Sequence, residues 1–251
     1  MSGHSHWSTI KRKKGAADAK RGQLFTKLAR ELTLAAREGG GDPEMNLRLQ
    51  YAIDRAKANN MPKDNIERAI KRGTGELKDG VEMEEIYYEG YGPHGIALMI
   101  LCVTENRNRT VSELRHILTR SGGTMADVGS VAWQFTRSSY FTFPCEDCDQ
   151  DMVFELAVEA GADDVSFENN EAEMIGEIEV FGQISSRLKE AGIKPELAEL
   201  RMIPNNLVDL DKDQTLQVFN VIEALEELDD VQEVYSNLNL SDEMMAVLES
   251  A

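Results

Sequence analysis

The sequence predicts an α+β fold, in which an N-terminal three-helix domain is followed by two ferredoxin-like α/β domains, one inserted in the other. Two observations lead to this prediction. Apolar residues recur at helical spacing up to residue 73, and after Gly75 the pattern changes to β-rich segments that alternate with helices. The chain has 251 residues, which is long enough for two or three domains.

The helical domain is predicted at residues 24–78. Glycine, proline and asparagine residues separate its helices, as expected for tight turns in a small bundle. Residues 1–23 precede it and are predicted to form a polar, basic arm that is mobile when unbound. The apolar stripes of the three predicted helices cover residues 24–38, 45–56 and 62–73.

The first α/β domain is predicted to be discontinuous. Its first part contains two strands, a helix and a third strand, and therefore lacks a second covering helix. A strong amphipathic helix at 214–228 and a strand at 231–236 supply the missing elements. We therefore predict one domain at 81–136 plus 206–251. Its other expected elements are strands at 86–91, 96–104 and 130–135 and a helix at 110–120.

The second α/β domain is predicted as an insertion at residues 137–205. This segment contains six elements in the order β-α-β-β-α-β, which is the order of a complete ferredoxin-like unit. It would therefore have its own core. The expected strands are 140–143, 164–168, 174–180 and 199–203, with helices at 152–160 and 181–191.

The charge of the chain is divided between its two ends. Residues 1–75 hold 16 Lys/Arg and 8 Asp/Glu, whereas the remaining 176 residues hold 11 and 37. A basic end on an acidic body is typical of a polyanion-binding module. A basic face that is merely solvated is the alternative.

The predicted nucleic-acid-binding residues lie in this basic end. Cations would neutralise phosphates, and the ring of Trp7 would stack on a base. Trp7 could instead anchor the arm to the bundle. The predicted contact residues are Trp7, Lys11, Arg12, Lys13, Lys14, Lys20, Arg21, Lys27 and Arg30.

A secondary contact is predicted at Arg107 and Arg109. They lie in the segment 106–110, between a predicted strand and a predicted helix, on an otherwise acidic body. A loop in which the asparagines cap the helix is an equally good interpretation.

Other functional motifs are rejected. The GxGxxG match at 90–95 is followed by a β-rich segment rather than a helix, so we predict a hairpin loop. Cys145 and Cys148 supply only two of the four ligands of a structural zinc site, and three cysteines give no disulfide framework. With no catalytic constellation, we expect no enzyme activity, no cofactor, no metal and no small-molecule substrate. With no apolar run near the roughly 20 residues of a membrane span, we expect a cytoplasmic protein without a membrane partner.

Several motifs of the chain together resemble those of one known family. They are Gly3-His4-Ser5, Trp7, Ile10-Lys11, residues 18–22, 25–28, 88–93 and 106–110, and Gly129–Trp133. The family that they closely resemble is YebC/PmpR, which includes the mitochondrial translational activator of cytochrome c oxidase. The resemblance covers essentially the whole chain, although His6, Arg12 and His94 depart from the residues usual in the family. It implies three domains and a non-enzymatic regulator of gene expression, and it carries the basic positions over to Lys11, Lys13, Lys14, Lys20, Arg21, Lys27 and Arg30.

The leading functional hypothesis is a nucleic-acid-binding, ribosome- or RNA-associated translation factor. The alternative is a DNA-binding transcriptional regulator, and an enzyme with an unrecognised site is a weaker one. The expected partner is ribosomal RNA or DNA, with the ribosome as a further candidate. None of the predicted helices has an obvious set of base-reading Asn or Arg residues at its start, which disfavours sequence-specific DNA recognition.

Overall fold

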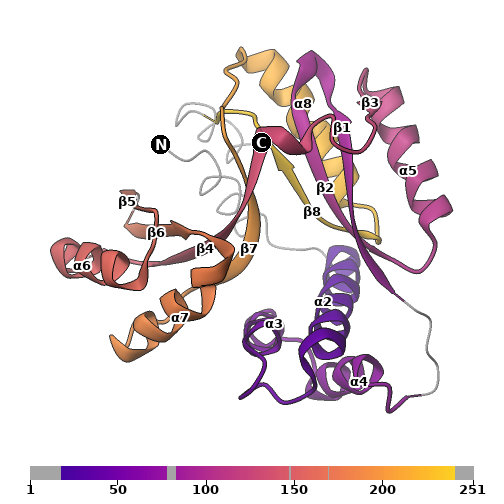
Figure 1. Cartoon of the computed structure of the whole chain (residues 1–251). Helices are drawn as coiled ribbons and strands as arrows, with labels where there is room; N and C mark the ends of the chain where they lie inside the picture. Colours follow the sequence, from indigo (N-terminus) through magenta and orange to yellow (C-terminus); the bar gives the residue numbers. More distant parts are fainter. Residues whose placement is uncertain (1–17, 78–82, 147, 169, 241–251) are drawn as a thin grey trace.

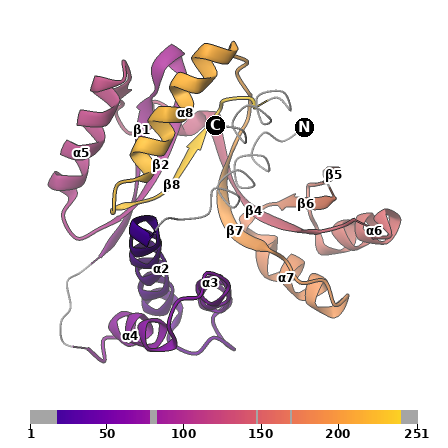
Figure 2. The same cartoon turned by 180° about the vertical axis from the view of Figure 1, so that it is seen from behind.

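The computed structural model describes residues 18–77, 83–146, 148–168 and 170–240, with side chains from residue 21 onward. The predicted α+β fold is confirmed. A helical domain lies beside two α/β parts, each built on its own four-stranded sheet (Figures 1 and 2).

The helical domain consists of α2 (Asp18–Gly39), α3 (Leu47–Ala58) and α4 (Lys63–Gly73). The predicted arm boundary at residue 23 is wrong, because residues 18–23 already belong to α2. They contain good helix formers and no proline, so the helix extends toward the N-terminus. The core of the bundle includes Leu28, Leu32, Leu49, Ala52, Ala56, Ile66 and Ala69.

Asn46 fixes the turn between α2 and α3. Its Oδ1 accepts a hydrogen bond from Leu49 N (3.1 Å), which caps α3. Its Nδ2 donates to Ala35 O and Gly40 O, both at 2.8 Å. The cap therefore starts α3 at Leu47. Met45 was predicted to lie on the apolar stripe of this helix, but it precedes the helix and is exposed.

The first sheet has the strand order β3-β1-β2-β8, and neighbouring strands are antiparallel. Helices α5 and α8 contribute buried residues to the core on one face of this sheet, including Leu114, Leu118, Phe219 and Leu225. The order is ferredoxin-like, with β1 brought forward in the chain. The elements are β1 (Glu84–Tyr91), β2 (Ala97–Thr104), α5 (Arg107–Arg120), β3 (Thr124–Met125), α8 (Lys212–Glu226) and β8 (Val231–Ser236).

The second sheet has the order β5-β6-β4-β7, again with antiparallel neighbours. This is the order of a complete ferredoxin-like unit, with α6 and α7 packed over a core that contains Phe141, Phe143 and Ile184. The elements are β4 (Phe135–Pro144), α6 (Gln150–Ala160), β5 (Asp164–Glu168), β6 (Glu171–Gly176), α7 (Phe181–Glu190) and β7 (Leu197–Pro204).

Two predicted strands are wrong. The strand expected at 174–180 ends at Gly176, and Ile178–Val180 forms the short 3-10 helix η3. The strand expected at 130–135 is a loop with a 3-10 turn, η2 (Ala132–Gln134), and Phe135 already begins β4. Residues 130–134 do not form a strand because the carboxylate of Glu89, which is distant in the sequence, accepts hydrogen bonds from their backbone N–H groups. Those groups are then not available to pair with a neighbouring strand.

The hairpin loop predicted at 90–95 is confirmed, since the short 3-10 helix η1 (Pro93–Gly95) joins β1 to β2. His94 has a left-handed backbone, with a φ of 60°, a conformation that normally favours glycine. The nested division at 81–136 plus 206–251 and 137–205 stays a proposal, which the pairing of β8 with β2 supports.

Close packing of α2 on α4 depends on Gly73. A Cβ atom at this position would lie 2.3 Å from Thr33 O and 2.8 Å from Ala36 Cβ. We predict that Gly73→Ala destabilises the protein by about 1–3 kcal/mol, because the two helices must separate to admit the methyl group. Urea unfolding measures the change.

Gly22→Ala is the matched control. This glycine also lies in α2, but an added Cβ would have no neighbour within 4 Å. The substitution should raise the free energy of unfolding by about 0.5–1 kcal/mol through helix propensity. Equal effects at the two positions would contradict the packing argument.

Candidate nucleic-acid interface

One face of α2 is docked on the end of α8 rather than free in solvent. Gln23, Lys27 and Arg30, which we call the α2 stripe, recur at helical spacing and donate hydrogen bonds to backbone carbonyls there. Lys27 Nζ donates to Glu226 O (2.5 Å) and Gln23 Nε2 to Glu227 O (3.4 Å). Arg30 donates to Asp229 O. Two of the predicted nucleic-acid contacts, Lys27 and Arg30, therefore already have partners within the chain.

The end of α8 attracts cations for two reasons. Its carbonyl groups carry the partial negative charge of a helix C-terminus, and its last turn contains no basic residue of its own. Four acidic residues, Glu226, Glu227, Asp229 and Asp230, lie in or just after this turn. The α2 stripe supplies the positive charge that the helix end lacks.

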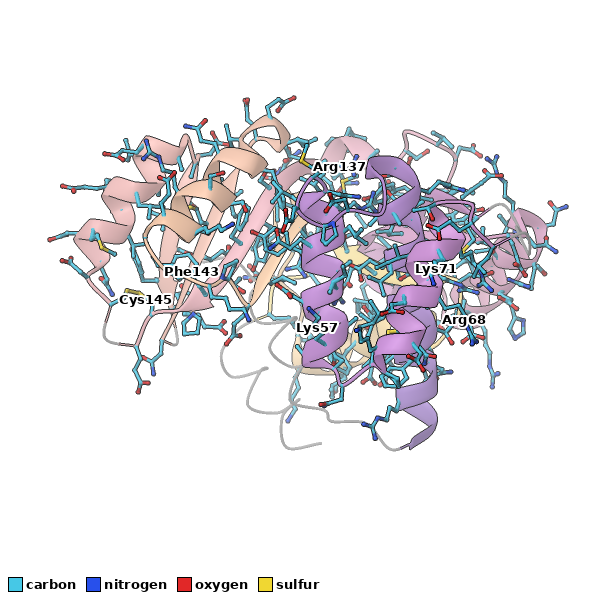
Figure 3. The ribbon with its side chains drawn as sticks, turned by 90° about the horizontal axis from the view of Figure 1, so that it is seen from below. Lys57, Arg68, Lys71, Arg137, Phe143 and Cys145 are labelled. Atoms are coloured by element: carbon cyan, nitrogen blue, oxygen red, sulfur yellow. A yellow bond between two sulfur atoms is a disulfide. The ribbon has the colours of Figure 1, made fainter. Side chains whose placement is uncertain are left out.

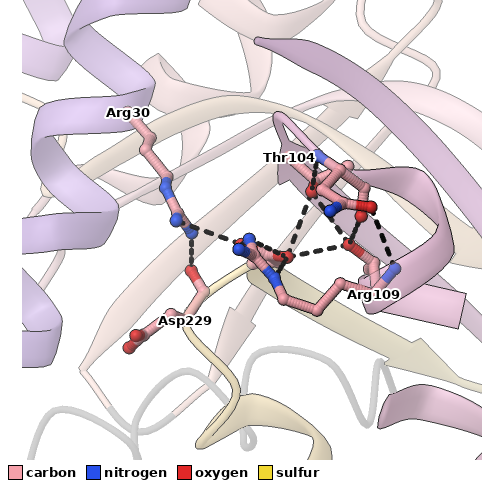
Figure 4. A network of polar contacts seen from close by, with 7 residues as sticks. Arg30, Thr104, Arg109 and Asp229 are labelled. Atoms are coloured by element: carbon pink, nitrogen blue, oxygen red, sulfur yellow. Dashed lines mark hydrogen bonds and ion pairs between the residues drawn. The ribbon is translucent and has the colours of Figure 1, made fainter. Parts of the chain in front are cut away.

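Asp230 is the buried centre of this contact, with only 1% of its side chain exposed. Arg30 Nη2 lies 3.0 Å from its Oδ1, and Arg109 Nη2 lies 2.8 Å from its Oδ2. Thr104 and Thr110 hydroxyls donate to Oδ2 at 3.1 and 2.8 Å. Figure 4 shows Arg30 and Arg109 reaching toward one another from separate elements, beside Thr104.

The Asp230 carboxylate is held in its ionised form. Burial alone would raise its pKa, but the hydrogen bonds from Arg109 and Thr110 and the charge of Arg30 outweigh burial and lower the pKa. A buried carboxylate that is this well paired stays charged at neutral pH and keeps attracting Arg30.

Arg107 and Arg109, predicted as a secondary nucleic-acid contact, lie in the capped first turn of α5. Asn106 Oδ1 accepts a hydrogen bond from Arg109 N (3.1 Å), so α5 begins at Arg107 rather than at the predicted residue 110. Arg109 is bound to Asp230, and the exposed Arg107 is bound to Glu84, with 2.9 Å between Arg107 Nε and Glu84 Oε2. A phosphate would have to compete with these carboxylates.

Most of the predicted basic arm lies outside the described residues. This applies to Trp7, Lys11, Arg12, Lys13 and Lys14 and to the side chain of Lys20. Arg21 is described and exposed, with its guanidinium carbon 5.8 Å from the centre of the Phe25 ring.

The structure adds basic residues that are not among the contacts predicted from the sequence. Arg37, Arg68 and Lys71 are exposed, and none of them forms an ion pair within the described part of the chain. Figure 3 labels Arg68 and Lys71 on one side of the helical domain and Lys57, which belongs to α3, apart from them. The signal in the sequence was the run of cations on α4 opposite the buried Ile66 and Ala69.

A cavity of about 370 Å³ lies where the helical domain meets the two sheets. The charged side chains that line the cavity are largely paired with one another. Arg48 lies 2.6 Å from Glu85, and Arg55 lies 3.4 Å from Glu31. Arg137 stacks at 6.0 Å on the ring of Tyr87. The remaining walls are mainly apolar, and include Leu24, Leu28, Leu34, Leu47, Leu101, Val103 and Phe181.

The sequence reading also missed a fixed loop between β3 and β4. The buried Glu89 carboxylate accepts hydrogen bonds from the backbone N–H groups of Gly129 (2.6 Å), Val131 (2.6 Å) and Ala132 (2.9 Å). The loop presents Val128 and Trp133, which are 96% and 70% exposed. Burial opposes the charge of Glu89, but these backbone hydrogen bonds prevail and lower its pKa.

The cysteines differ from expectation in one respect. Cys145 and Cys148 are joined by a local disulfide, whereas the sequence analysis considered this pair only as zinc ligands. Cys102 is a free, buried thiol, and burial raises its pKa to about 12. Across the described ranges, no group of three or more His, Cys, Asp or Glu residues is placed to hold a metal ion. None of the helices in those ranges has the length and apolar character needed to cross a bilayer.

Two family models match this architecture. The TACO1/YebC protein N-terminal domain matches residues 5–76, and the TACO1/YebC second and third domain matches residues 83–238. The chain belongs to the TACO1/YebC family. Its helical domain corresponds to the first match, and both sheets lie within the second.

Individual relatives of this TACO1/YebC chain match over nearly their full length. A "Probable transcriptional regulatory protein" of Geotalea uraniireducens is 52% identical and covers 98% of each chain. A protein of the same name in Acidithiobacillus ferrooxidans is also 52% identical, covering 100% of this chain and 99% of its own. The crystal structure of the conserved hypothetical protein Aq1575 from Aquifex aeolicus is 42% identical, with a TM-score of 0.80 over 90% of this chain and 93% of that one.

The Glu89 loop gives a prediction for pH dependence in this family member. Because the pKa of folded Glu89 lies below its usual 4.5, the stabilisation is complete above that value and is lost as the pH falls through the folded pKa. Glu89→Gln should cost about 1–3 kcal/mol at pH 7, and the difference from the wild type should shrink at acid pH. Urea unfolding at a series of pH values checks this.

Glu105→Gln is the control, since Glu105 is an exposed carboxylate at the end of β2. Its effect at pH 7 should be small. A Glu89→Gln deficit that stays constant from neutral to acid pH would show that the carboxylate charge does not hold the loop.

Proposed function

We propose that the chain is a non-enzymatic, nucleic-acid-binding regulator of gene expression that acts in the cytoplasm as a ribosome- or RNA-associated translation factor. The observation that carries the proposal is the division of charge, with 16 Lys/Arg against 8 Asp/Glu in residues 1–75 and a strongly acidic remainder. The exposed Arg37, Arg68 and Lys71 place part of this positive charge on the helical domain. Phosphates would bind there, while the acidic body would be repelled.

RNA is favoured over a specific DNA site because polar residues at the starts of α3 and α4 are engaged within the chain. Asn46 uses its side chain to cap α3, and Arg48 pairs with Glu38 and Glu85. Lys63 at the start of α4 pairs with Glu67. A recognition helix would need such residues free to reach base edges.

The alternative function is a DNA-binding transcriptional regulator. The names of the Geotalea and Acidithiobacillus relatives favour it. An enzyme is a weaker alternative. Sequence preference among duplexes separates the two leading functions, because a specific site binds at least about 10³-fold tighter than random duplex.

We predict that removing the arm charges weakens binding and its salt dependence. The variant replaces Lys11, Arg12, Lys13 and Lys14 with Ala. If each cation contacts a phosphate, the slope of log affinity against log salt falls by about 3–4 units. Titration of a labelled RNA at several salt concentrations measures the slope.

A matched control removes the same charge from the acidic body. Arg115, Arg120, Lys189 and Lys194 are exposed there, and their replacement by Ala should leave the slope unchanged. Equal slopes for the arm variant and the wild type would contradict the proposed role of the arm.

We further predict that the protein sediments with ribosomes at low salt and is released at high salt, because salt screens the attraction to phosphate. Binding to a panel of DNA duplexes should show little sequence preference. A preference of about 10³-fold for one promoter, without ribosome association, would instead establish the transcriptional function.

A further inference from the structure

Two of the cations proposed to bind phosphate are occupied inside the folded chain. Arg30 is only 15% exposed, and its guanidinium donates to Asp229 O and pairs with the Asp230 carboxylate. Lys27 Nζ donates to Glu226 O at 2.5 Å. A phosphate oxygen and these protein oxygens require the same donors, so both cannot be bound fully at once.

We propose that the contact of the α2 stripe with residues 226–230, here called the clamp, is autoinhibitory and that nucleic acid opens it. Phosphates would replace the α8 carbonyls and the Asp230 carboxylate as partners of Lys27 and Arg30. The inference rests on the proposed function and adds a regulation of the same site. The clamped form would bind through the exposed cations alone, and the open form would add those of the stripe.

The clamp has the features of a releasable contact. The side chains of the α2 stripe bind backbone oxygens and one carboxylate in the clamp. Phosphate oxygens could therefore replace these protein oxygens without the displacement of an apolar side chain. When the clamp opens, Asp230 keeps Arg109, Thr104 and Thr110, so its buried charge stays paired. On the other side, α2 keeps its own core with α3 and α4.

The other contacts of the helical domain with the α/β parts are partly polar and partly apolar. Arg48 pairs with Glu85 at 2.6 Å and Arg55 lies 3.8 Å from Glu199, while the Tyr51 ring packs edge-on against that of Phe181 at 6.0 Å. Interfaces that depend in part on such polar pairs permit relative motion of domains. The observed affinity would then be lowered by the fraction of molecules that are closed.

The test uses the full chain and a labelled ribosomal-RNA hairpin. Asp230→Asn removes the charge that holds Arg30 and should tighten binding about three- to tenfold. Glu105→Gln is the matched control, because Glu105 lies near Arg109 but outside the clamp. The Glu105→Gln variant measures the increase in RNA affinity that results from the loss of one acidic charge alone. Adding Arg30→Gln to Asp230→Asn should abolish the specific gain.

A second variant guards against misfolding at the buried position. Glu227→Gln with Asp229→Asn weakens the negative end of α8 at two exposed residues. It should also tighten binding more than Glu105→Gln with Glu113→Gln, which removes the same charge nearby.

A distance measurement decides the outcome. Dyes placed by amber suppression at the exposed Met45 and Val128 report the separation of the helical domain from the first sheet. A change in their energy transfer at saturating RNA, with the affinity gain of Asp230→Asn, supports the clamp. RNA binding with unchanged transfer and no gain over Glu105→Gln overturns it. Failure of the wild type to bind RNA or DNA at all would overturn the proposed function itself.

Discussion

The ionised Asp230 carboxylate constrains the way in which four elements of this protein meet. Asp230 lies four residues after the end of α8 and immediately precedes β8. Its carboxylate is bound by Thr104 at the end of β2 and by Arg109 and Thr110 of α5. Arg30 adds the helical domain. A buried charge is tolerated only when it is fully paired, so the position of each of these groups limits the others.

The pairing of Asp230 with Arg30 also links the stability of the folded chain to the distribution of charge along the sequence. The acidic end of α8 has no cation of its own, and the α2 stripe provides one from the basic part of the chain. Lys27 and Arg30 of α2 thus have a structural partner in addition to any nucleic acid. The exposed Arg37, Arg68 and Lys71 have none within the described residues, so binding by the closed protein would depend on them and on the basic arm.

The sequence was informative where local pattern decides structure. The strands at 164–168 and 231–236 and the helix at 181–190 were predicted within a residue, because their periodicity and turns are local. The strand at 130–135 was predicted wrongly because Glu89, about 40 residues earlier, binds its backbone. Lys27 and Arg30 were predicted as free cations because their partners lie 199 residues further along. Periodicity carries no information about such distant partners.

If Arg30 is shared between Asp230 and phosphate, the NMR signals of its guanidinium Nη–H groups, which contact Asp229 O and Asp230, report the exchange most directly. Arg109 is the internal control, because it binds Asp230 but lies on α5, outside the α2 stripe. On addition of saturating ribosomal-RNA hairpin at low salt, we expect the Arg30 signals to shift and to change their exchange rate with water while the Arg109 signal retains its protection. Arg30 signals that are unchanged when the RNA is fully bound would show that Arg30 stays with Asp230 and does not transfer to phosphate.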